Sequence, residues 1–302
     1  MLRSTLYHGP GHLLLGTTAI LAADDIKVVL KPEYDDVGAN GYGVIDRRRK
    51  NLKVEVTCTP LEWNNLSLLL PYAATQIGAS VFGGGTDTDV PLSIVPRNGA
   101  NSGLALTNVA VTKMPGIRFA ATKGPLGSMT FTGIIAGTEL ADPTADASYY
   151  AAAAVGTLPA PDLTKLRTGV YHAVWGAALP KFFSKDGFEV EADLQLQEVM
   201  VDGYGTVDMT LAGLTASVKV TPVGVSMAQL LTAVSGGLGK SPAKADLLIK
   251  DSADATVFTL HNCQCLSGEA SYGNNADRVS ALEFKAVRSA SGGALSQLWT
   301  IA

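Results

Sequence analysis

The chain has 302 residues, of which 47% are hydrophobic and 17% charged, with 32 glycines and a formal net charge of −4. This balance excludes a disordered chain and indicates a folded protein with many turns. The mild acidity argues against a protein that grips nucleic acid by neutralising its phosphates. Three cysteines, two of them separated by one residue, make no disulfide framework, and we expect folding in a reducing cytosol.

The N-terminal segment faintly resembles a secretory signal, because Arg3 precedes two short apolar runs. Gly9-Pro10-Gly11 and Gly16-Thr17-Thr18 interrupt those runs. We therefore expect this segment to belong to the fold. The sequence contains no uninterrupted apolar run of about 18 residues, so it predicts no membrane span.

A long β-hairpin is predicted around a Gly-Tyr-Gly turn at residues 41–43. Residues 26–30 are strand-like, and residues 52–57 alternate apolar and polar side chains at period two, which is typical of a strand with one buried face. Thr59 and Pro60 follow as an expected helix N-cap and first helical residue, with Glu62 in a capping box. Further strands are expected at residues 92–95, 104–111, 117–122 and 129–135.

The second part of the chain repeats this order. Gly203-Tyr204-Gly205 lies 162 residues after Gly41-Tyr42-Gly43, and the same offset aligns Thr59-Pro60 with Thr221-Pro222. Tyr7-His8 likewise aligns with Tyr171-His172 at a nearly equal offset. After Thr221-Pro222 a helix is expected, with one apolar face formed by Met227, Leu230, Leu231 and Val234.

An internal duplication explains these matches. We predict a mainly β protein with two tandem β-sandwich or barrel domains, each with one flanking α-helix and a long hairpin. The first domain spans residues 1–137 and the second residues 169–302. Between them, residues 138–168 are rich in alanine and proline and are predicted to be a connector.

Candidate chemistry is weak in both copies. His261, Cys263 and Cys265 would share one face of a strand, as metal ligands could, but the first copy has Thr107, Val109 and Val111 there. The loop from Gly236 to Ser241 lacks the first glycine of a phosphate-binding motif. His8 and His172 are expected to be structural, and Asp46 and Asp208 to bond to nearby backbone. We predict no catalytic residue, cofactor or metal, and no enzymatic activity.

Arg47, Arg48, Arg49 and Lys50 form a basic run that the second copy lacks. Three interpretations are open. The run is a solvated loop, or it contacts a neighbouring subunit through acids such as Asp35 and Asp36. DNA binding is the third.

The order of strand, long hairpin, Thr-Pro helix and further strands resembles the major tail tube proteins of long-tailed phages. The resemblance implies β-domains whose sheets join between neighbours into rings, and rings that stack into a hollow tube. A duplicated chain would form homotrimers with pseudo-sixfold symmetry. The implied location is the virion tail, and the implied partners are the tape measure, terminator and distal tail proteins. Genomic DNA would pass through the lumen without specific binding.

By this resemblance, the hairpins would contact the next ring. The candidate contact residues are Asp35, Asp36, Tyr42, Arg47, Arg48, Arg49, Lys50 and Tyr204. Two other functions fit the same pattern. One is a distal tail or baseplate ring protein of the same fold, and the other is a carbohydrate-binding β-sandwich adhesin, which exposed aromatic side chains on one face would favour.

Overall fold

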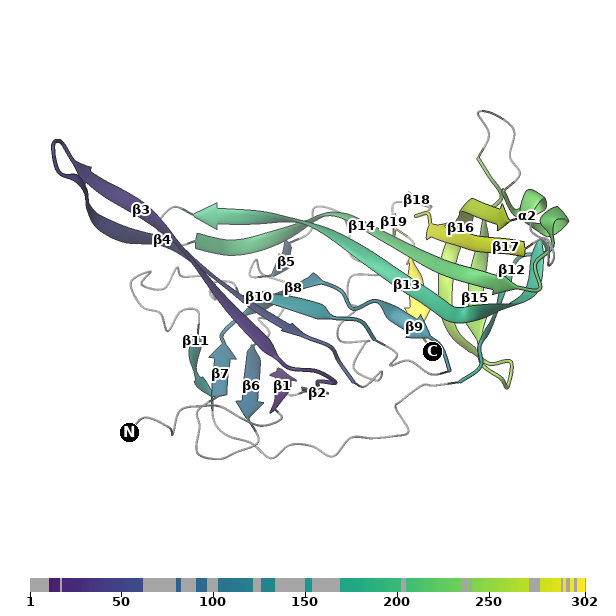
Figure 1. Cartoon of the computed structure of the whole chain (residues 1–302), viewed down its shortest axis with the longest axis horizontal. Coiled ribbons are helices and arrows are strands. Elements are labelled where there is room, and N and C mark those ends of the chain that lie inside the picture. Colours follow the sequence, from purple (N-terminus) through teal and green to yellow (C-terminus); the bar gives the residue numbers. More distant parts are fainter. Residues whose placement is uncertain are drawn as a thin grey trace.

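The structure is a computed structural model. It describes residues 11–16, 18–61, 80–82, 91–96, 103–121, 126–133, 150–153, 169–201, 205–234, 238, 241–271, 278–288, 290–291, 294–295 and 298–301. The described residues form 20 strands and a single helix, which confirms a mainly β fold. Figure 1 shows an elongated molecule with a long hairpin projecting from one end and the helix at the other.

The second half is a closed six-stranded barrel. Every strand pairs antiparallel with the next, and the last pairs with the first. In order around the barrel the strands are β12 (His172–Trp175), β15 (Ala245–Lys250), β16 (Thr256–Ser271), β17 (Arg278–Ala286), β14 (Gly205–Val223) and β13 (Leu179–Val201).

Alternation along β14 explains this barrel, because Ala216, Val218 and Val220 point inward and are buried while Ser217 and Lys219 point outward. Aromatic rings fill the interior. The largest fully buried side chains there include Trp175, Phe182, Phe188 and Phe284. Burial of each contributes roughly 1.5–3 kcal/mol to stability.

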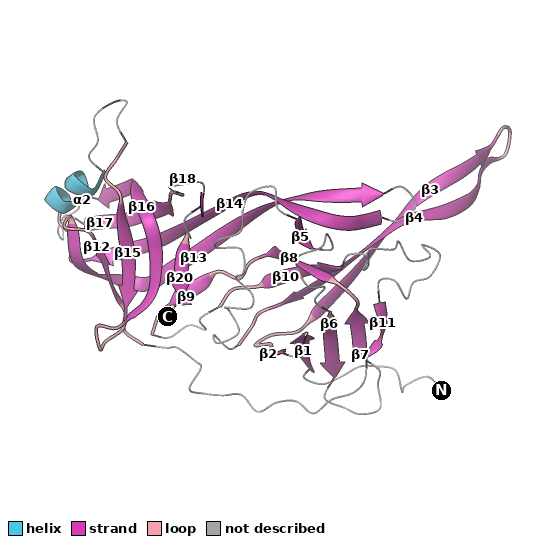
Figure 2. Cartoon of the chain, turned by 180° about the vertical axis from the view of Figure 1, so that it is seen from behind, coloured by secondary structure: helices cyan, strands magenta, loops and turns pink. Residues whose placement is uncertain are grey.

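In the first half, the described antiparallel strands form two separate sheets and no closed barrel (Figure 2). One sheet has the order β11 (Tyr150–Ala153), β7 (Gly103–Leu106), β6 (Leu92–Pro96), β1 (Gly11–Leu15) and β2 (Thr18–Leu21). The other has the order β3 (Lys27–Ala39), β4 (Gly43–Cys58), β10 (Met129–Gly133) and β8 (Val109–Lys113).

Strand registers match between the halves. Val28 lies opposite Val56 in the first hairpin, and Val190 lies opposite Val218 in the second, so both strands keep the offset of 162 residues. Next to them, Phe131 faces Val56 and Phe284 faces Val218. Similar pairings are what a duplication would leave, and we call two residues matched when they hold the same place in these pairings.

The register matches His172 with His12. His172 lies opposite Lys250, and His12 lies opposite Val95. Each histidine is followed four residues later by a glycine with positive φ, Gly16 at 59° and Gly176 at 52°. The predicted partner, His8, lies outside the described residues. The glycine that turns the hairpin therefore supports matching His172 with His12.

The predicted start of the second helix was wrong. β14 continues through Pro222, which lies opposite Ser184, and the helix α2 (Met227–Val234) begins after Ser226. The Ser226 amide donates to Gln229 Oε1 at 2.9 Å, and the Gln229 amide donates to Ser226 Oγ at 3.3 Å. This reciprocal capping box fixes the start of the helix.

The buried face of α2 also differs from the expectation. Leu230 and Ala233 are its buried residues, whereas Leu231 is 60% exposed. Leu230 packs against β16 beside Gly268, where a Cβ would lie 2.1 Å from Leu230 Cδ1. The absence of a side chain at that glycine therefore lets the helix approach the sheet.

Two first-half expectations also change. Pro60 pairs with Ala22 in an isolated β-bridge, so no helix begins at Pro60, and residues 62–79 lie outside the described residues. Within the predicted connector, β11 pairs with β7 and so belongs to the first half's sheet. β20 (Trp299–Ile301) takes the matched place on β16 in the second half.

Two first-half strands join the second half's sheet. β9 (Ile117–Phe119) pairs with β13, and β5 (Ser80–Phe82) pairs with β14. A short pair of strands, β18 (Ala290–Ser291) and β19 (Ala294–Leu295), completes the described elements. One chain therefore already joins two β-units by adding a strand to a sheet edge.

Candidate assembly surface

The hairpin of β3 and β4 extends well beyond the two sheets (Figure 1). Near its tip, Tyr42 is 84% exposed, Val44 54% and Ile45 60%. Gly41 and Gly43, with φ of 82° and 73°, provide the left-handed backbone that the turn requires. A long polar arm with an apolar tip is costly to leave in water and suits contact with another molecule.

The predicted contact charges pair across this arm. Arg47 Nε lies 2.9 Å from Asp36 Oδ1, and Lys50 Nζ lies 3.9 Å from Asp35 Oδ1. Arg48 lies opposite Asp35 and Arg49 opposite Tyr34 in the strand register. Asp35 and Asp36, the acids considered for contact with a neighbouring subunit, therefore also have basic partners within the same hairpin. Tyr204, the other predicted tip residue, lies outside the described residues.

Asp46 behaves as the sequence predicted, because its Oδ1 accepts a hydrogen bond from the Arg47 amide at 2.8 Å. The charged pairs of the arm are exposed, and such pairs contribute about 0–1 kcal/mol each.

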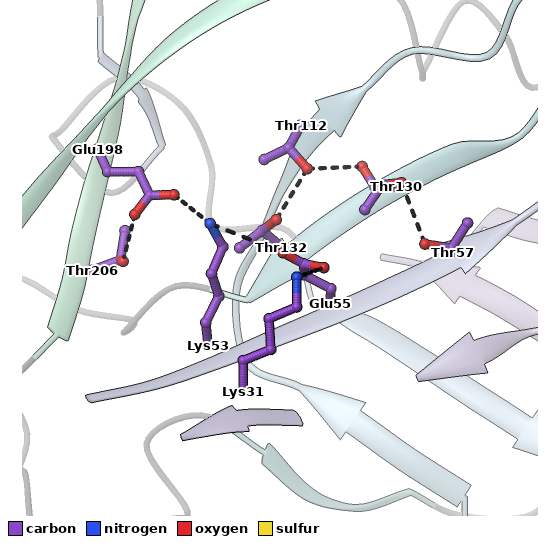
Figure 3. Close-up of polar contacts among 9 residues, drawn as sticks. All are labelled: Lys31, Lys53, Glu55, Thr57, Thr112, Thr130, Thr132, Glu198 and Thr206. Carbon is purple, nitrogen blue, oxygen red and sulfur yellow. Dashed lines mark hydrogen bonds and ion pairs between the residues drawn. The ribbon is translucent and has the colours of Figure 1, made fainter. Parts of the chain in front are cut away.

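A chain of ion pairs joins the base of the first long hairpin, β3 and β4, to the turn end of the second, β13 and β14 (Figure 3). Lys31 Nζ lies 2.6 Å from Glu55 Oε2, on the neighbouring strand. Lys53 Nζ lies 2.5 Å from Glu198 Oε1, which belongs to β13 of the second half. Glu198 also accepts a hydrogen bond from Thr206 Oγ1 at 3.4 Å. This network connects the two hairpins where the end of the second approaches β4.

Threonines continue the same face of the first half, across β4, β10 and β8 (Figure 3). The hydroxyls of Thr57 and Thr130 are 3.3 Å apart, and those of Thr112 and Thr132 are 3.0 Å apart. Neutral hydroxyls beside balanced ion pairs make this face polar without a strong net charge. A polyanion would find no basic track among these residues.

The contact between β9 and β13 also joins the two halves. Phe119 lies opposite Phe188 and is 1% exposed, with its ring 5.4 Å from that of Tyr171 and 5.7 Å from that of Phe258. Beside it, Arg118 Nη2 lies 2.7 Å from Glu189 Oε1. The first half thus supplies Phe119 to the core of the second.

From the sequence, residues 117–122 are expected to form a strand of the first copy's own sheet. The strand exists, but its partner lies in the second half. Gly187, with φ of 97°, marks the place, because a Cβ there would lie 2.7 Å from the Phe119 carbonyl oxygen. A glycine in an otherwise alternating strand was the available signal of close backbone approach.

His261, Cys263 and Cys265 do not share one face of the strand, as the sequence pattern had suggested. The β15–β16 register shifts between residues 260 and 263, and Asn262 has φ of 47°. His261 therefore turns outward, with Nδ1 3.3 Å from Asp246 Oδ2 and Nε2 3.2 Å from Thr300 Oγ1, while Cys263 and Cys265 point into the core. No group of three or more potential metal ligands occurs among the described residues.

The buried thiols are poor nucleophiles. Burial raises the pKa of Cys58 and Cys263 to about 12 and that of Cys265 to about 11. Each thiol is therefore protonated at neutral pH and packs as a small apolar group.

Asp246, His261 and Thr300 lie in the order of a catalytic triad, but Asp246 Oδ1 also accepts a hydrogen bond from the Asn262 amide at 2.7 Å. That bond fits a role in holding the β-bulge.

His172 is buried, and its Nε2 lies 2.9 Å from Asp254 Oδ1. Hydrogen bonds from His172 and Lys250 lower the pKa of Asp254 below its ordinary value. The matched His12 is also buried, but its Nδ1 has no hydrogen-bond partner among the described residues. The two histidines therefore share a place in the fold and not a chemical environment.

Comparison with known proteins gives no family: no family model and no curated protein matches the chain. Within the part of the chain that the structure describes, the helix is too short to cross a membrane.

Proposed function

We propose that this chain is a phage major tail tube protein, a structural virion protein whose rings stack into a hollow tube for DNA. One observation carries the proposal. Within a single chain, two β-units with matched strand registers are joined because β9 of one adds to β13 of the other. Repeating that contact between chains gives a heterologous interface, which closes into a ring when the rotation permits.

Two further features support a tube. The exposed arm of β3 and β4 can reach an adjacent ring, and its apolar tip needs cover. The threonine and ion-pair face gives DNA little to adhere to, as a conduit requires. With two units in each chain, a trimer would present six units around the ring. DNA would then pass without specific contacts, and the other tail proteins would meet the ends of the tube.

The tryptophans do not support the adhesin alternative. Trp175 is 1% exposed and Trp299 4% exposed, so neither can stack on a sugar ring, and Trp63 lies outside the described residues. A distal tail or baseplate ring protein remains the second candidate, because it would use the same lateral contacts.

Electron microscopy of the purified protein over a concentration series, with mass measured in solution on the same samples, tests the proposal. We expect rings of three chains with six lobes, which stack into hollow tubes at high concentration. Rings that never stack would favour the distal tail alternative. A monomer at every concentration would overturn the proposal.

A further inference from the structure

Among the described strands, the outer edge of β3 has no neighbour, whereas the matched edge of β13 in the second half is covered by β9. Val28 is 38% exposed, whereas the matched Val190 is 4% exposed. Two residues before each, Ile26 is half-buried and the matched Phe188 is fully buried. Leu30, further along β3, is 53% exposed. An apolar row therefore lies along an edge strand of the first half.

The cause of this difference is β9. It adds to β13 at Phe188–Val190 and buries Ile117 and Phe119 against that strand. β3 ends its sheet, with β4 as its neighbour among the described strands. A bare sheet edge with apolar side chains is a ready template for another strand.

A second edge without a partner among the described strands lies along the distal part of β16. β15 pairs with β16 only as far as Cys263, while β17 accompanies the other side of β16 to Ser271. On this distal part of β16, Leu266 is 51% exposed and Glu269 is exposed. This part of β16 is matched to β8, since Cys265 faces Phe284 as Val111 faces Phe131. β9 follows β8 along the chain.

Charge also favours this pair of edges. Within the chain, Arg118 on β9 binds Glu189 on β13. The residue matched to Glu189 is Lys27, because Lys27 faces Thr57 and Glu189 faces Lys219 at the same offset. The acidic partner that Lys27 would need is present on the donor edge as Glu269. In this second pair the basic residue lies on the receiving strand β3 and the acidic residue on the added strand β16, the reverse of Glu189 and Arg118. This charge pattern favours a contact between the second half of one chain and the first half of another.

We propose that the distal edge of β16, residues 264–271, of one copy adds antiparallel to β3, at residues 26–30, of the next copy. Lys27 then meets Glu269, and Val28 and Leu30 become buried. In both contacts a strand receives an antiparallel neighbour along its outer edge: β13 receives β9 within the chain, and the matched β3 receives the distal part of β16 from another chain. It rests on the proposed ring assembly and assigns the surfaces that join its chains.

The first experiment compares assembly of the wild type with the double variant Val28→Lys/Leu30→Lys. Both positions are exposed, so the fold tolerates the change, which circular dichroism and the melting temperature verify. We expect the concentration for half-assembly to rise at least tenfold, with monomers replacing rings. Leu231→Lys, on the exposed side of α2, is the matched control and should assemble as the wild type does. Tyr42→Lys, at the arm tip, should leave rings intact and prevent stacking.

The second experiment swaps charges. Lys27→Glu and Glu269→Lys should each weaken assembly, and the double swap should restore it toward the wild-type concentration. With cysteines at both positions, Lys27→Cys/Glu269→Cys, mild oxidation should yield covalent oligomers of the full chain.

The outcomes separate the two proposals. If the wild type forms rings and Val28→Lys/Leu30→Lys forms them equally well, the edge contact is wrong and ring assembly stands. The same holds if the charge swap gives no rescue and the cysteine pair gives no covalent oligomer. If the wild type itself never assembles, both proposals fail.

Discussion

The two halves share strand registers but differ in closure. In the second half, β13 and β16 each run unbroken past a bulge and take part in both faces of a barrel. In the first half the corresponding paths are divided, β2 from β3 and β7 from β8, and two sheets result. Side-chain volume differs in the same way. The first half has Leu15 and Ile26 where the second half has the larger Trp175 and Phe188. A barrel closes where aromatic side chains and a borrowed strand fill it.

The largest effect is expected from removing the side chain of Phe119, which the first half contributes to the core of the second. Phe119→Ala deletes a buried ring that contacts Tyr171 and Phe258, and it should lower the free energy of unfolding by about 3–5 kcal/mol. Because Phe119 belongs to the first half, we also expect the variant to unfold in two separate transitions where the wild type unfolds in one. Chemical denaturation followed by tryptophan fluorescence measures both.

Phe183→Ala is the control for that experiment, since Phe183 is 41% exposed and belongs to the second half itself. It should cost much less and leave the transition single. Equal losses from the two variants would show that β9 adds nothing special to the barrel.

A smaller effect is expected where β9 approaches the bulge of β13. In Gly187→Ala the new Cβ would lie 2.7 Å from both the Phe119 carbonyl oxygen and Ala120 Cβ, at a φ of 97°. Gly224→Ala introduces comparable backbone strain at a φ of 86° but meets no atom within 4 Å. Such strain alone costs about 1–3 kcal/mol.

Gly187→Ala should therefore destabilise the protein more than Gly224→Ala, and hydrogen exchange at Ile117–Phe119 should accelerate only in the former. Thermal unfolding and exchange mass spectrometry provide the two measurements. Unchanged protection of β9 in Gly187→Ala would refute the close approach.

The smallest expected difference is in pH dependence. Burial lowers the pKa of His12 below its ordinary value of 6.5, so the neutral ring is favoured in the folded state. This contribution to stability is present above pH 6.5 and is lost as the pH falls toward the lower folded-state pKa. His12→Leu should flatten this part of the stability profile, which denaturation at a series of pH values can test.

Asp254 marks the second half in the same titration. Its pKa lies below the ordinary value of 3.8, mainly because His172 hydrogen-bonds to it. Its contribution is present above pH 3.8 and is lost only as the pH falls through the lower folded-state value. The first half should thus weaken at a higher pH than the turn at Asp254. A wild-type profile that His12→Leu leaves unaltered near pH 6 would contradict this order.

Local patterns in the sequence determined the mainly β class, both long hairpins and the 162-residue offset between them. The reason is that alternation and a glycine turn fix the register of neighbouring strands through local interactions. This is seen in the pairing of Val28 with Val56 and of Val190 with Val218. The capping residue Ser226 was also readable, because Gln229 completes its box three residues later.

Only the tertiary structure decided which strands meet across the halves. β9 has three residues and pairs with a strand about 70 residues away, and a short apolar segment carries no mark of its partner. The outward turn of His261 depends on one bulge at Asn262, which reverses the side-chain alternation that sequence alone presumes. Closure of one half and the open edge of the other follow from long-range packing, where side-chain volume and a strand from elsewhere decide the outcome.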